Sequence, residues 1–153
     1  MYKTVVFDLD GTLLNTLTDL ADAGNRLCRK YGWPTHERQA YRYFVGNGIP
    51  KLVERLAPAD QRTPAVLEAA LADFKRDYGQ HLRDTTAPYP GIPEMLAKLK
   101  ANGVQLAVFS NKADALAKEV VKDYFGTQYF TIVRGQMTGV APKPAAEGTN
   151  ALL

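Results

Sequence analysis

The sequence has little cysteine and no long apolar run, and each absence excludes a class of protein. The single cysteine, Cys28, rules out an internal disulfide and favours a reducing compartment, so we expect a cytoplasmic protein. No stretch reaches the roughly 20 apolar residues that a membrane span needs. The short run VVF near the N-terminus is followed directly by acids, which is not typical of a secretory signal. We therefore expect no membrane association.

The sequence also lacks any block of like charges. Its net charge is +3, but the basic residues are interleaved with acidic ones, as in KRDYG and LAKEVVKDYF. Nucleic-acid-binding tails carry runs of about five or more like charges, so we expect no nucleic-acid partner. A mildly basic chain suits a small anionic ligand. The hydrophobic content of 46% is that of an ordinary globular protein, so the chain can bury a core.

Hydrophobic periodicity predicts alternating strands and helices in the second half of the chain. Strands are expected over 104–109 and 129–133, and helices over 93–100 and 113–124. A further buried strand is expected over 4–7. This order predicts parallel strands joined by right-handed crossovers, which is a Rossmann-like α/β fold.

A long helical segment separates the first predicted strand from the others. Its apolar residues recur at helical spacing, which predicts helices over 17–31, 38–44, 49–56 and 64–82. We therefore expect a discontinuous α/β core, formed by residues 1–15 and 87–153, that is interrupted by an all-helical insertion at residues 16–86.

Polar side chains follow the predicted strands at their carboxyl ends. Asp8 and Asp10 come directly after the first strand, Ser110 ends the second, and Lys143 follows the third. In open α/β sheets this edge is where ligands bind, so we expect the four residues to converge there. Taken singly, each has a plainer interpretation: the acids as a capped turn, Ser110 as a helix N-cap, and Lys143 as a solvated loop residue.

Together these groups suit phosphoryl transfer. A carboxylate can attack phosphorus and form an aspartyl-phosphate, and a second carboxyl two residues on can move the proton. A serine hydroxyl and a lysine can hold the non-transferring oxygens as charge develops on them. Because two carboxylates would repel a phosphate, we also expect a hard divalent cation, and Mg²⁺ prefers oxygen ligands.

The motifs FDLDGTLLNTLTDL, FVGNG, YPG, FSNK and PKP resemble those of the haloacid dehalogenase superfamily, and of its phosphoglycolate-phosphatase-like members in particular. The resemblance covers nearly the whole chain and identifies the helical insertion as a cap. It implies that Asp8 is the nucleophile and a metal ligand, and that Asp10 is the general acid/base and binds the metal through its backbone carbonyl. It implies further that Lys143 neutralises charge. The implied substrate-binding residues are Gly11, Thr12, Gly46, Asn47, Gly48, Ser110 and Asn111.

The resemblance implies a Mg²⁺-dependent phosphatase that acts on a small phosphorylated metabolite such as 2-phosphoglycolate. An acid at Asp10 favours this over a dehalogenase, because an alkoxide leaving group needs a proton and a halide does not. A sugar phosphomutase of the same family and a non-catalytic, truncated phosphatase fold stay open. For Arg55, in the helical insertion, contact with a substrate carboxylate and a solvated helix face both stay open.

One part of the family pattern is missing from the sequence. Members of the family continue past the lysine with an acidic fourth motif that completes the magnesium shell, whereas the only acid here after Lys143 is Glu147, which we do not expect to bind metal. We therefore expect a core that is incomplete at its C-terminal side, weakened Mg²⁺ binding and impaired catalysis. We also expect the first strand to have an open edge through which copies of the chain can associate.

Overall fold

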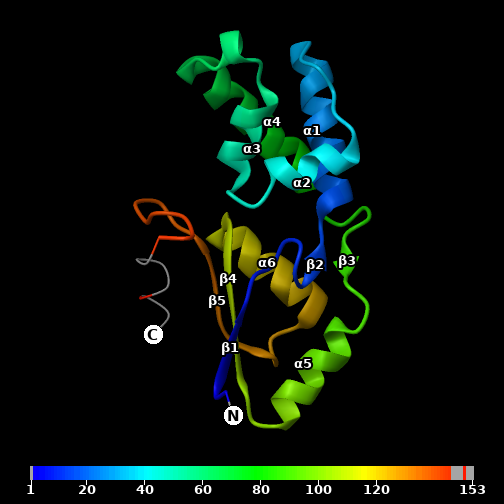
Figure 1. Ribbon diagram of the computed structural model, residues 1–153, viewed down its shortest axis with the longest axis vertical. Coiled ribbons are helices and arrows are strands. Elements are labelled where there is room, and N and C mark those ends of the chain that lie inside the picture. Colours follow the sequence, from blue (N-terminus) through cyan, green and yellow to red (C-terminus); the bar gives the residue numbers. More distant parts are fainter. Residues whose placement is uncertain (1, 146–149, 151–153) are drawn as a thin grey trace. The chain divides into compact units, whose positions relative to one another are not determined.

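The chain folds as two compact units, seen in the computed structural model, which describes residues 2–145 and 150 (Figure 1). The first unit comprises Met1–Asn15 and Ala87–Leu153, and the second comprises Thr16–Thr86. The first contains the parallel sheet and the second consists of helices and their connections. The prediction of an α/β fold with a helical insertion is confirmed.

The sheet of the first unit has the strand order β1-β4-β5, and neighbouring strands are parallel. Its strands are β1 (Thr4–Phe7), β4 (Gln105–Ala113) and β5 (Phe130–Gln136). Helix α5 (Ile92–Ala101) precedes β4, and helix α6 (Asp114–Phe125) connects β4 to β5. Among the residues that the structure describes, β1 pairs with β4 alone, so it is an edge strand.

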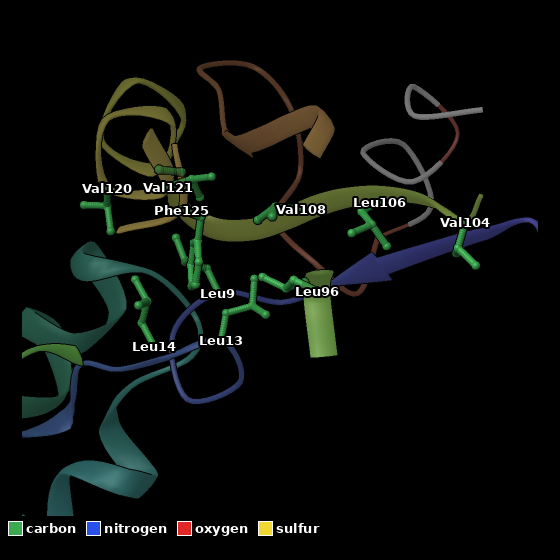
Figure 2. Close-up of a cluster of buried hydrophobic side chains, with 11 residues drawn as sticks. Leu9, Leu13, Leu14, Leu96, Val104, Leu106, Val108, Val120, Val121 and Phe125 are labelled. Atoms are coloured by element: carbon green, nitrogen blue, oxygen red, sulfur yellow. The ribbon is translucent and has the colours of Figure 1, made fainter. Parts of the chain in front are cut away.

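The hydrophobic core of the first unit fixes the turn that follows β1. Leu9, Leu13 and Leu14 are fully buried in that turn, and they pack against side chains of β4, α5 and α6 (Figure 2). The partners in this cluster are Leu96, Val104, Leu106, Val108, Ala117, Val120, Val121 and Phe125. Because Leu9 and Leu13 lie on either side of Asp10 in the sequence and are buried in the core, the core fixes the position of this polar turn.

Strand β4 is longer than the sequence predicts. It continues past Ser110 to Ala113, which pairs with Gln136 after a register shift that begins at Phe109. The placement of Ser110 at the end of this strand is therefore wrong, because Ser110 lies within its irregular final part. The structure also contains two short antiparallel strands, β2 (Leu14–Asn15) and β3 (Ala87–Pro88), which were not predicted. A strand of two residues is too short to show any periodicity.

The second unit packs its helices around buried aromatic and aliphatic side chains. They are α1 (Leu17–Tyr31), η1 (Arg38–Ala40), α2 (Tyr41–Phe44), α3 (Ile49–Leu56), η2 (Ala59–Gln61) and α4 (Pro64–Gln80). Tyr41 is fully buried and lies so close to α1 that a Cβ at Gly24 would stand 2.5 Å from its ring. None of the helices among the described residues is both long and apolar enough to cross a membrane.

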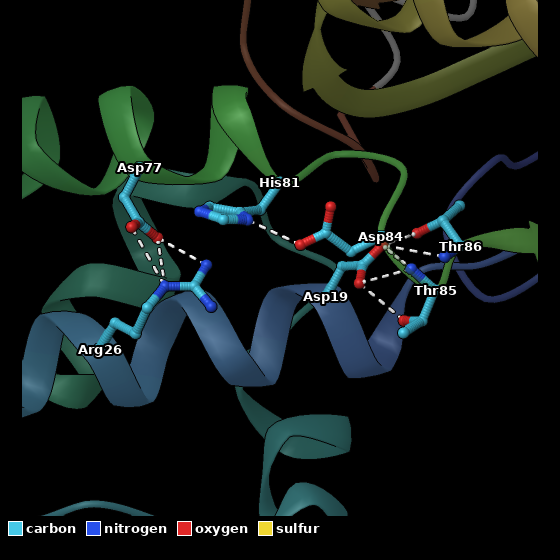
Figure 3. Close-up of polar contacts among 7 residues, drawn as sticks. All are labelled: Asp19, Arg26, Asp77, His81, Asp84, Thr85 and Thr86. Atoms are coloured by element: carbon cyan, nitrogen blue, oxygen red, sulfur yellow. Dashed lines mark hydrogen bonds and ion pairs between the residues drawn. The ribbon is translucent and has the colours of Figure 1, made fainter.

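The last residues of the second unit are bound to its first helix through one carboxylate. Asp19 is buried in α1 and accepts hydrogen bonds from the backbone N–H and the hydroxyl of both Thr85 and Thr86, at 2.6–3.1 Å (Figure 3). Burial by itself raises the pKa of Asp19, but the hydrogen bonds from the two threonines outweigh it and hold this pKa below its usual value. The carboxylate thus joins residues 66 positions apart in the sequence.

Candidate active site

The candidate site begins at the carboxyl end of β1, where a tight turn presents two carboxylates. Asp8 directly follows the strand, and its Oδ1 accepts a hydrogen bond of 2.9 Å from the backbone N–H of Leu9. Gly11 has a φ of 78°, a conformation that favours glycine, and its N–H donates to Leu14 to close the turn. The Asp8 side chain is 46% exposed, so it is accessible to a ligand.

Lys143 reaches Asp8 from the far end of the chain. Its Nζ donates to Asp8 Oδ1 at 3.0 Å and to the backbone carbonyl of Phe109 at 2.8 Å. The loop that carries Lys143 is held by Asn111, whose Oδ1 accepts from the Lys143 N–H and whose Nδ2 donates to the Lys143 carbonyl. Asn111 is therefore bound to the lysine loop through its side chain, a contact that sequence reasoning missed.

Ser110 is buried in the irregular end of β4. Its Oγ accepts a hydrogen bond of 3.0 Å from the backbone N–H of Lys112. An oxygen that already accepts from a fixed N–H has its own O–H proton directed elsewhere. The Ser110 hydroxyl can therefore donate a hydrogen bond to another acceptor.

Lys112 is a residue of this site that sequence reasoning missed. Its side chain is 3% exposed, and its Nζ lies 3.4 Å from Oδ1 of Asp10. The signal that would have found it is the strand alternation that drew attention to Asp8 and Asp10. Lys112 stands two residues after Ser110, and alternate residues of a strand share a face.

The charges and donors of this site fit a magnesium ion together with a phosphate. Asp8 and Asp10 stand beside Lys143 and Lys112, and a phosphate monoester would bring nearly two further negative charges, which a divalent cation can offset. The hydrogen bonds that the described residues make to the Asp8 carboxylate both fall on Oδ1, so within this part of the chain Oδ2 is available to a ligand. Mg²⁺ is commonly held by one or two carboxylates, with phosphate and water completing its shell.

The described residues contain no group of three or more acidic, histidine or cysteine side chains that could hold a metal. Among the described residues the acids at this site are Asp8 and Asp10, and Glu147 lies outside the described residues. Carboxylates after Lys143, which the family pattern would place there, are not among the described side chains. The magnesium fit rests on Asp8 and Asp10 together with a bound phosphate.

The predicted substrate loop, Gly46-Asn47-Gly48, belongs to the second unit and connects α2 to α3. Both glycines have positive φ values, 106° and 87°, a conformation that other residues rarely adopt. Arg55 is hydrogen-bonded to the loop and to the residues before it. Its guanidinium donates to the carbonyls of Tyr43 and Phe44 and to Oδ1 of Asn47. Arg55 is thus bound to the predicted substrate loop, and contact with a substrate carboxylate stays a prediction.

Comparison with known proteins places the chain in a family. The family model described as haloacid dehalogenase-like hydrolase matches residues 5–153. The chain belongs to the haloacid dehalogenase-like hydrolases. Within this family it is 33% identical over 145 residues to phosphoglycolate phosphatase from Thiobacillus denitrificans, and 34% identical over 146 residues to that from Neisseria meningitidis.

These matches cover 93% and 94% of this chain but only 64% and 62% of the two relatives, so the chain spans less than two thirds of their length. The crystal structure of a predicted phosphoglycolate phosphatase from Haemophilus somnus has the same fold, with a TM-score of 0.87 and 27% identity. That comparison covers 99% of this chain and 70% of the other.

Proposed function

We propose that this haloacid dehalogenase-like protein is a Mg²⁺-dependent phosphatase that hydrolyses a small phosphate monoester through an aspartyl-phosphate at Asp8. The observation that carries the proposal is the contact of 3.0 Å between Lys143 Nζ and Asp8 Oδ1, at the end of β1 and two residues before Asp10. A lysine beside a carboxylate lowers the repulsion that an incoming phosphate meets. An exposed carboxylate held in this way is suited to attack on phosphorus.

In the first step, a carboxylate oxygen of Asp8 forms a bond to phosphorus while the bond from phosphorus to the leaving alkoxide breaks. Asp10 donates its proton to that alkoxide. In the second step, a water molecule attacks the aspartyl-phosphate and passes a proton to Asp10. The bond between phosphorus and Asp8 breaks, and inorganic phosphate leaves.

The remaining residues bind and orient the phosphoryl group. The Ser110 hydroxyl and the Asn111 backbone hold the non-transferring oxygens, and Lys143 neutralises the charge that they share with Asp8. Gly11 and Thr12 form the turn that keeps the two carboxylates in place. Asp8 and Asp10 would hold Mg²⁺, which when bound neutralises the charge that develops on the phosphoryl oxygens.

We propose 2-phosphoglycolate as the substrate, because the relatives that share a third of their residues with this chain carry the name phosphoglycolate phosphatase. In this proposal the first unit is the catalytic core and the second is the cap, whose loop Gly46-Asn47-Gly48 contacts the substrate. The single cysteine supports a cytoplasmic location.

The proposal predicts phosphate release from 2-phosphoglycolate that requires Mg²⁺ and stops when a chelator removes it. Colorimetric measurement of phosphate tests this, with an aryl phosphate as a general phosphatase substrate. Conversion of a sugar phosphate that requires a bisphosphate primer would instead indicate a phosphomutase. The absence of turnover with every one of these compounds, in a protein that is folded, would contradict the proposal and favour a non-catalytic fold.

We further propose that copies of the chain associate through the open edge of β1. Among the described residues this edge has no strand partner, and Val6 is 51% exposed in a strand without charged side chains. Exposed, apolar edges pair readily with other strands. We predict a concentration-dependent dimer in analytical ultracentrifugation, weakened by V6K, which places a charge on the edge. A monomer at every concentration would contradict this.

A further inference from the structure

Lys112 is a buried cation at the candidate active site, and nothing in the proposed reaction yet uses it. It lies in the irregular end of β4, where its backbone N–H is bound to Ser110. An ammonium group removed from water is costly unless an opposite charge compensates it. The group lies 3.4 Å from Oδ1 of Asp10, which is close enough for an ion pair.

One oxygen of the Asp10 carboxylate lies close to this lysine. Its Oδ1 is buried and accepts no hydrogen bond within the described residues. Asp10 stands in the turn after β1 and forms an isolated backbone bridge with Leu14, which holds its backbone and leaves its side chain to be oriented by other contacts. The ion pair with Lys112 is the charged contact that the described residues give to this oxygen.

The backbone of Lys112 is itself held tightly. A Cβ placed on Gly135, in the neighbouring strand β5, would lie 2.3 Å from the carbonyl oxygen of Lys112. Such an approach is possible only beside a glycine, so β5 packs directly against this part of β4.

The site therefore contains two carboxylate–lysine pairs with different surroundings. Asp8 pairs with Lys143 at 3.0 Å, and that carboxylate is 46% exposed. Asp10 pairs with Lys112, and their side chains are 22% and 3% exposed. The exposed pair faces a ligand, whereas the buried lysine has no such access, so it acts on a ligand only through Asp10.

We propose that Lys112 is a positioning residue that holds the Asp10 carboxyl in the orientation required for proton transfer. This inference rests on the proposed function, because it takes Asp10 to be the group that moves the proton. It assigns Lys112 no direct contact with the substrate.

The kinetic test compares K112M with the unchanged protein on an aryl phosphate. Misplacing a general acid costs about 10²-fold, so kcat should fall by about that factor while KM changes by less than about threefold. In the D10N background, K112M should cause no further loss. The conservative K112R should recover part of kcat. K118M is the matched control, because Lys118 pairs with Asp114 on α6, outside the site, and it should leave both constants unchanged.

A rise in KM with kcat unchanged would overturn the inference, since it would make Lys112 a binding residue. The inference would also be overturned if K112M reduced kcat by the same factor in the D10N background as in the unchanged protein. A second measurement does not depend on activity: urea unfolding of the unchanged protein, K112M, D10N and the double variant. K112M changes the unfolding equilibrium constant by some factor in the unchanged protein. We expect the corresponding factor in the D10N background to be smaller by at least about fivefold.

Equal effects in the two backgrounds would show that the residues are not coupled and would overturn the inference. If the chain hydrolyses no phosphate ester, the proposed function fails while the unfolding measurement still decides whether Lys112 and Asp10 interact. If K112M does not fold, K112Q replaces it in both measurements, with the same expected results and the same results that would overturn the inference.

Discussion

Replacing Asp8 with Asn is expected to reduce phosphate release about 10³-fold or more. A neutral amide oxygen is a far weaker nucleophile than a carboxylate, and removing the nucleophile from a covalent mechanism leaves only the contribution of binding. The substitution also removes the charge partner of Lys143, which lies 3.0 Å away. Initial rates on an aryl phosphate with Mg²⁺ measure the effect.

The D8N side chain keeps the size of the original and can still accept the hydrogen bond from the Leu9 N–H. We therefore expect a folded protein, with an unfolding midpoint close to that of the unchanged chain. D60N is the matched control, because Asp60 is exposed in η2 of the second unit. Equal rates for D8N and the unchanged protein would remove Asp8 from the mechanism.

The second large effect is on stability: D19N should destabilise the protein by about 3 kcal/mol, or about 10 °C in Tm. The Asp19 carboxylate accepts from two backbone N–H groups and two hydroxyls of Thr85 and Thr86. An amide offers one acceptor in place of two and turns its NH₂ group toward these donors. Urea or thermal unfolding at neutral pH measures the loss.

The same carboxylate makes this contribution depend on pH. The hydrogen bonds hold the pKa of Asp19 below its usual value in the folded protein. A group with a lowered folded pKa stabilises the protein above its unfolded pKa, and the contribution is lost as the pH falls toward the folded pKa. The difference between D19N and the unchanged protein should therefore shrink below about pH 4.

Asp84 offers the control for this prediction. It lies one residue before Thr85 and pairs with His81 at 2.6 Å, but its side chain is 55% exposed (Figure 3). Exposed pairs contribute little, so D84N should change stability by no more than about 0.5 kcal/mol. A D19N protein as stable as D84N would show that the contacts of Asp19 do not hold the end of the second unit.

Much of the fold was predictable from periodicity. The β-branched and aromatic residues at 4–7 predicted β1 where the structure has it, and the helical stripe after it predicted α1 over the same residues. The prediction that this strand is buried is wrong: Thr4 and Val6 are exposed, and among the described residues the strand pairs on one side only. The segment 38–44 was predicted as one helix but is a 3-10 turn followed by a short α-helix. Periodicity over seven residues does not separate these two conformations, because their repeats differ by less than one residue per turn.

The candidate site was partly predictable, because strand ends converge in parallel sheets. This rule brought Asp8 and Lys143 together as candidates across 135 positions of sequence, and the structure has them in contact. Their catalytic roles stay predictions. Lys112 was missed because a lysine near the end of a strand ordinarily lies in solvent. Strand alternation places Lys112 on the same face as Ser110, but its burial depends on tertiary packing.

Asp19 shows a second limit of sequence reasoning. An aspartate in the first turn of a helix ordinarily interacts with the helix dipole and stays exposed. Here its partners lie 66 residues away and belong to the segment that ends the second unit. Nothing local distinguishes the two cases, since the distinction depends on how the ends of the second unit pack together.

The central claim is that Asp8 carries the phosphoryl group during the reaction. Acid quenching during turnover of a fast-leaving aryl phosphate, followed by mass spectrometry of the peptide that contains residues 4–10, tests it most directly. The account predicts a peptide heavier by one phosphoryl group, with the modification on Asp8 and absent from D8N. Phosphate release without any modified peptide, or a modification that persists in D8N, would contradict it.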